Sequence, residues 1–69
     1  MDIHHLARMA NQIGEFFASA TGHEAAITDT ANHLRNFWEP RMRREIVEYA
    51  KSGGVELSEV ARAAVLKLA

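Results

Sequence analysis

The chain of 69 residues has no cysteine, and it contains one proline and one tryptophan. The lack of cysteine excludes disulfides, thiolate metal sites, cysteine-held iron–sulfur clusters and thiol nucleophiles. A domain of this length buries only about 60 % of the surface of its unfolded chain, and one such core rarely supplies more than roughly 3–5 kcal/mol. Because no disulfide is available, the means that remains for strengthening this small core is a partner chain.

Long hydrophobic runs are also missing. No apolar stretch approaches the roughly 18 residues that a membrane span requires. The first residues, Met-Asp-Ile-His-His, have neither the basic nor the apolar region of a secretory signal. We therefore expect a soluble, intracellular protein that does not enter a membrane, which in a bacterium means a cytoplasmic one.

Helical periodicity runs through the whole chain, and strand alternation is absent. Asp2 and Ser58 are placed to cap helices, Pro40 suits the first position of a helix, and the pair Gly53-Gly54 suits a helix end. The pattern predicts an all-α fold in one domain, residues 1–69, built as a small bundle of about four short helices with short connections. The predicted helices span about 3–18, 24–37, 40–51 and 58–68.

The residue types that usually carry chemistry do not form a site. His4 and His5 point about 100° apart on a helix, and His23 and His33 are nearly three turns apart. The sequence that follows Gly53-Gly54 is Val-Glu-Leu and not the Lys-Ser/Thr of a phosphate-binding loop. We expect no catalytic residue, no bound cofactor and no metal ligand in this chain.

Two pairs of adjacent aromatic residues, Phe16-Phe17 and Phe37-Trp38, are the most informative feature. Neighbouring side chains on a helix diverge by about 100°, so both members of a pair cannot enter one small core. One member of each pair is expected in the core and the other at its edge, where it would form part of a docking patch. The predicted partner-binding residues are Phe17, Phe37, Trp38, Arg41, Met42, Arg43 and Arg44.

The arginines of this segment lie in an otherwise acidic chain. The net charge of the chain is −1, whereas residues 35–44 carry four arginines against Glu39 alone, a sum of +3. Three of these arginines fall near the start of the third predicted helix, where the helix dipole favours anions. Pairing of Arg41 with Glu45 and of Arg44 with Glu48 would make this a solvated helix face; recognition of carboxylates on a partner is the alternative. Nucleic acid is a third candidate partner, although the chain lacks the broad basic surface that such binding normally shows.

Two stretches are distinctive: Arg-Met-Ala-Asn-Gln-Ile at 8–13, with Phe-Phe shortly after, and Phe-Trp-Glu-Pro-Arg-Met-Arg at 37–43. They resemble the delta subunit of the multi-subunit, molybdenum-containing, NAD-dependent formate dehydrogenases. The resemblance covers about residues 6–66, and it departs from many relatives at Ser58, where they have proline.

This resemblance implies a cytoplasmic complex that oxidises formate to carbon dioxide and reduces NAD. In that family the alpha subunit holds bis-molybdopterin guanine dinucleotide and most iron–sulfur clusters, the beta subunit holds FMN and the NAD site, and the gamma subunit holds a further cluster. The delta subunit is implied to be the cofactor-free member that assembles with or stabilises the complex through the large catalytic subunit.

Two alternatives to a permanent subunit remain. The chain would act as an assembly factor that assists insertion of the molybdenum cofactor into the large subunit, or as a small nucleic-acid-binding regulator. In isolation it is a candidate for a homo-oligomer formed through Phe37-Trp38.

Overall fold

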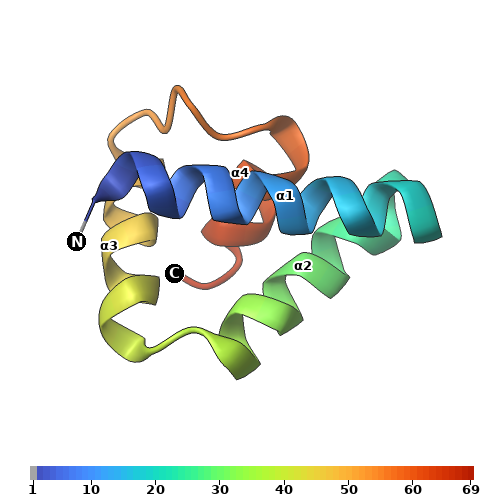
Figure 1. Cartoon of the computed structure of the whole chain (residues 1–69), viewed down its shortest axis with the longest axis horizontal. Coiled ribbons are helices and arrows are strands. Elements are labelled where there is room, and N and C mark those ends of the chain that lie inside the picture. The colour runs from blue at the N-terminus through green and yellow to red at the C-terminus, as the bar shows by residue number, and fades with distance from the viewer. Residues whose placement is uncertain (1) are drawn as a thin grey trace.

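The computed structural model describes residues 2–69 and contains four helices, with no strand among those residues (Figure 1). They are α1 (Ile3–Thr21), α2 (His23–Phe37), α3 (Pro40–Lys51) and α4 (Glu59–Leu66). The predicted all-α fold of four short helices is confirmed.

The junction between α1 and α2 is shorter than the sequence suggested. Helix α1 continues through Thr21, whose hydroxyl donates a hydrogen bond to the Phe17 carbonyl oxygen at 2.9 Å. The chain then reverses at one residue, Gly22, whose φ of +87° is a conformation that favours glycine. A single glycine therefore joins the two helices, whereas the sequence predicted that the first ends at about residue 18 and the second begins at about residue 24.

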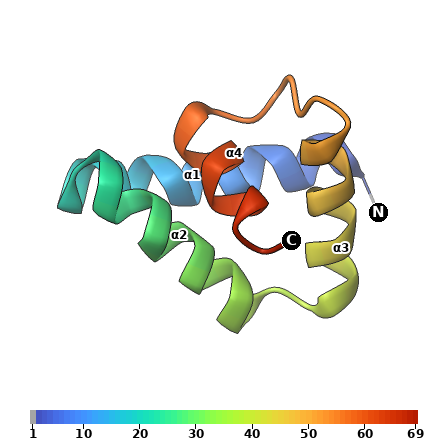
Figure 2. The same ribbon diagram turned by 180° about the vertical axis from the view of Figure 1, so that it is seen from behind.

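Helix α4 lies at the centre of the bundle and packs against each of the other three helices. Seen from behind, it crosses α1 and lies between α2 and α3 (Figure 2). Helices α2 and α3 hardly touch each other, and the C-terminus emerges between them. The largest fully buried side chains come from all four helices: Leu6, Leu34, Ile46, Val65 and Thr30.

The segment that joins α3 to α4 is fastened to α1 by the side chain of Asn11. The Asn11 side-chain amide donates a hydrogen bond to the Glu56 carbonyl oxygen, and its oxygen accepts one from the Ser58 backbone N–H, both at 2.8 Å. The Tyr49 hydroxyl also accepts a hydrogen bond from the Glu56 backbone N–H at 3.0 Å. Asn11 is thus a structural residue, although it stands in the stretch that carries the family resemblance.

Replacing Asn11 with alanine is expected to destabilise the fold by about 1–3 kcal/mol, because two hydrogen bonds of roughly 0.5–1.5 kcal/mol each are lost. Urea unfolding followed by far-UV circular dichroism would show this as a lower midpoint with an unchanged slope. The exposed neighbour Gln12 gives the matched control, since Gln12→Ala removes no hydrogen bond of this kind. Equal midpoints for the two variants would mean that the Asn11 side chain does not hold the segment between α3 and α4 against α1.

Candidate docking surface

Four ring-bearing side chains form a continuous strip across α1 and α2, which we call the aromatic strip: Phe16, Phe17, His33 and Phe37. The ring centres of Phe16 and Phe17 are 5.2 Å apart, those of Phe17 and His33 are 6.2 Å apart, and those of His33 and Phe37 are 4.8 Å apart. His33 and Phe37 are one helical turn apart, so they stand on the same face of α2. The strip therefore joins the end of one helix to the end of the next.

The outer members of the strip are strongly exposed. Phe16 is 67 % exposed and Phe37 is 74 % exposed, whereas Phe17 and His33 are half-buried between them. A shallow hollow of about 450 Å³, lined also by Met9 and Ile13, continues the apolar surface along α1. Single exposed apolar residues are common on proteins, whereas a contiguous apolar patch is a candidate interaction surface.

Trp38 is part of the core and not of the exposed strip. It is only 6 % exposed, and its extended backbone at the C-terminal end of α2 directs the chain away from Phe37. The expected division of the pair into one core and one edge residue is observed here. Trp38 was also predicted to bind a partner, but it has little surface to offer while the chain stays folded.

The pair in α1 divides differently. Phe17 is half-buried and lies outside the central core, and Phe16, which was not among the predicted partner-binding residues, is the more exposed member. Phe17 follows the buried Ala10 by seven residues, or about two turns, so it lies toward the buried face of α1. Counting helical turns from the buried residues of α1 would have identified Phe16 as the exposed member of the pair.

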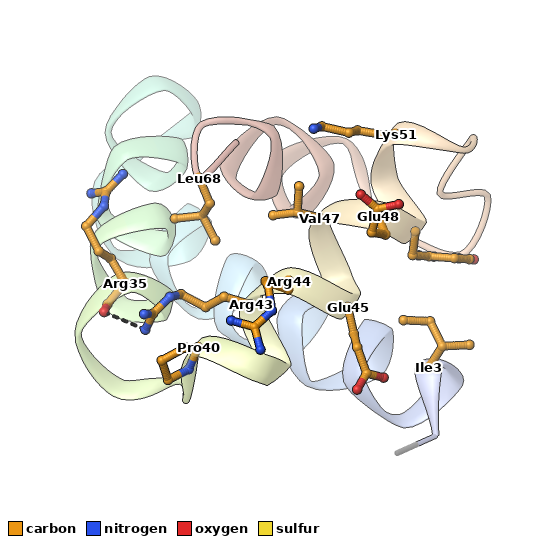
Figure 3. A pocket seen from close by; sticks show the side chains of 11 residues that line it. Ile3, Arg35, Pro40, Arg43, Arg44, Glu45, Val47, Glu48, Lys51 and Leu68 are labelled. Carbon is orange, nitrogen blue, oxygen red and sulfur yellow. Dashed lines mark hydrogen bonds between the residues drawn. The ribbon is translucent and has the colours of Figure 1, made fainter.

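Arg43 caps the C-terminal end of α2. Its guanidinium donates a hydrogen bond to the Arg35 carbonyl oxygen at 3.0 Å and another to the Trp38 carbonyl oxygen, and Figure 3 shows it reaching toward Arg35. A cation at a helix C-terminus satisfies free carbonyl groups and complements the helix dipole. Although Arg43 belongs to the first turn of α3, its charge therefore acts at the favourable end of α2.

The other residues after Pro40 have different surroundings. Arg41 forms an ion pair with Glu45 at 3.3 Å, as the spacing suggested, and Met42 packs against the core. Arg44 is exposed, and no ion pair with Glu48 is present among residues 2–69. Arg41 is thus paired, Arg43 caps a helix and Arg44 is exposed. None of the three lines the hollow beside the aromatic strip.

No group of three or more histidine, aspartate or glutamate side chains in the described part of the chain is arranged to hold a metal ion. Over residues 2–69, none of the helices is both long and apolar enough to cross a membrane.

Comparison with protein families gives the family of the chain. The model of the family described as NADH-dependent formate dehydrogenase delta subunit FdsD matches residues 5–65. The chain belongs to this family. No curated protein and no solved structure matches it.

Membership of the delta-subunit family confirms the resemblance seen in the sequence. A delta subunit is one member of a multi-subunit enzyme, so the family implies association with other subunits of a formate dehydrogenase. The whole aromatic strip, from Phe16 to Phe37, lies within the matched residues.

The capping role of Arg43 in this delta subunit predicts a measurable loss of stability. Arg43→Ala leaves the Arg35 and Trp38 carbonyl groups without their donor and is expected to cost about 1–2 kcal/mol. The neighbouring Arg44→Ala is the control and is expected to change stability by less than about 0.5 kcal/mol. Thermal unfolding monitored by circular dichroism compares the two, and an Arg43→Ala variant as stable as the control would contradict the cap.

Proposed function

We propose that this chain is a non-catalytic, cofactor-free subunit that binds the large catalytic subunit of a formate dehydrogenase through the aromatic strip. The complex oxidises formate to carbon dioxide and reduces NAD, while bis-molybdopterin guanine dinucleotide, iron–sulfur clusters and FMN reside in the other subunits. The observation that supports this proposal is the exposure of Phe16 and Phe37 at the two ends of one apolar strip.

The energetics favour docking at this strip. Complete burial of a phenylalanine side chain contributes about 1.5–3 kcal/mol. Clustered aromatic residues are the usual centres of binding energy in interfaces, and a partner that binds only the folded chain also stabilises it. For a domain with a core as small as this one, the stabilisation gained on docking is of the same order as the stability of the free chain, roughly 3–5 kcal/mol.

The same surface serves an assembly factor that binds the large subunit only until the molybdenum cofactor is inserted. Quantitative mass spectrometry of the mature complex, after size-exclusion chromatography, distinguishes the two roles. A stoichiometric amount of this chain supports the permanent subunit, whereas its presence only on cofactor-free large subunit supports the assembly factor. A chain that co-elutes with neither form would contradict the proposed function.

Nucleic acid is a weaker candidate partner. The side chain of Arg43 is held at the end of α2 and Arg41 is paired with Glu45, so these two arginines of the segment are engaged within the chain. A flat titration of the chain with duplex DNA at low salt is the expected result, because the net charge of the chain is −1.

A further inference from the structure

The weak contact between α2 and α3 leaves an open cleft of about 990 Å³, which we call the α2–α3 cleft. Its lining comes from Arg35 near the end of α2, from α3, from Ile3 at the start of α1 and from Leu68 near the C-terminus, most of which Figure 3 labels. The lining residues that matter for binding are Arg35, Arg43, Arg44, Val47, Lys51 and Leu68.

Positive charge is in excess in this cleft, although the Arg43 guanidinium is bonded to carbonyl groups at the end of α2. Four cations line it against only Glu45 and Glu48, and the Glu45 carboxylate is already paired with Arg41, which lies outside the cleft. The ion pairs in the described part of the chain are His4–Glu56, His23–Glu59 and Arg41–Glu45, and none of them includes a cation of the cleft. A locally basic cleft therefore occurs in a chain whose net charge is −1.

Apolar side chains lie between these charges. Val47 and Leu68 are half-buried and approach the cleft from α3 and from the C-terminal residues, and Ile3 contributes at the α1 side. A ligand that fits this lining carries carboxylates and at least one apolar side chain. A small inorganic anion would leave the apolar surface uncovered.

The cleft is separate from the aromatic strip. Arg35 stands two residues from both His33 and Phe37, which is about 200° around α2. The two surfaces share no lining residue. Helix α2 thus presents an apolar surface on one side and a basic one on the other.

We propose that the α2–α3 cleft binds an acidic peptide segment of a partner subunit, with an apolar side chain between its carboxylates. The twelve residues of α3 extend over about 18 Å at 1.5 Å per residue, which an extended segment of about five or six residues matches. This proposal rests on the proposed function, since the segment belongs to a subunit of the same complex. Nucleic acid fits less well, because a phosphate backbone would leave the apolar side chains of Val47 and Leu68 uncovered.

Zero-length cross-linking of the assembled complex tests the proposal. A carbodiimide joins a lysine amine to a carboxylate as an amide with loss of water, so it reports only direct contacts. The chain has two lysines, Lys51 in the cleft and Lys67 outside its lining. We expect mass spectrometry to find Lys51 joined to aspartate or glutamate residues within one short segment of a partner subunit.

Paired variants complete the test. Arg35→Gln combined with Arg44→Gln should weaken binding to the partner subunits by about ten-fold, remove most of the salt dependence and abolish the Lys51 cross-link. Arg62→Gln, an exposed arginine on α4, should bind as the wild-type chain does.

Three outcomes would overturn the inference. They are normal binding by the double variant, cross-links that involve Lys67 but not Lys51, or duplex DNA binding that the double variant loses. In the first two cases the wild-type chain still binds the complex and the proposed function stands. A wild-type chain that fails to bind any partner subunit would instead contradict the proposed function itself.

Discussion

Trp38→Ala is expected to unfold the isolated chain at 25 °C. The Trp38 side chain is only 6 % exposed and packs in the central core. Truncating a buried tryptophan to alanine costs about 3–5 kcal/mol, which equals the roughly 3–5 kcal/mol that a core of this size supplies. Far-UV circular dichroism should show a large loss of helical signal and no cooperative unfolding transition in urea.

The adjacent aromatic residue provides a matched control. Phe37 is 74 % exposed, so Phe37→Ala is expected to keep the fold and to change its stability by about 0.5 kcal/mol or less. If Trp38→Ala keeps a cooperative urea transition with the same midpoint as Phe37→Ala, then Trp38 is not a core residue. In that case its side chain would be available for docking, as the sequence alone suggested.

The helices were predictable because their signals are local. Asp2 accepts a hydrogen bond from the His4 backbone N–H at 2.9 Å, and the Ser58 hydroxyl accepts one from the Ala61 backbone N–H at 3.2 Å, as their capping positions indicated. Pro40 begins α3 because its fixed φ angle and its missing backbone N–H both suit the first position of a helix. Each of these signals involves residues within one turn of each other, so a single sequence contains all of the information.

The surface was less predictable because it depends on contacts between distant elements. Asn11 binds residues 45 and 47 positions later, and nothing in the local pattern distinguishes it from a solvated asparagine. Arg43 reaches back to α2 because the turn at Glu39-Pro40 brings the two helices together end to end. The arginines after Pro40 are one cluster in the sequence, but Arg41 turns to Glu45 while Arg43 and Arg44 line the α2–α3 cleft, since each residue turns the helix by about 100°.

The double variant Phe16→Ala with Phe37→Ala is expected to abolish association with the partner subunits. The two rings lie at the ends of the aromatic strip, and burial of each on docking contributes about 1.5–3 kcal/mol to the binding free energy. Their joint removal should therefore weaken binding at least about a hundred-fold. Biolayer interferometry with the immobilised complex lacking this chain measures the dissociation constant. Circular dichroism should show an unchanged fold, because neither ring belongs to the core.

Val55 supplies the control for this variant. It is 88 % exposed and lies on the segment between α3 and α4, away from the strip, so Val55→Ala also removes exposed apolar surface but should leave binding unchanged. Wild-type affinity in the double variant would exclude the aromatic strip as the main contact. Alternatively, Phe16→Ala with Phe37→Ala abolishes binding, while Arg35→Gln with Arg44→Gln only weakens it. That result would make the aromatic strip the source of affinity, and the basic cleft would then select which segment of the partner binds in the cleft.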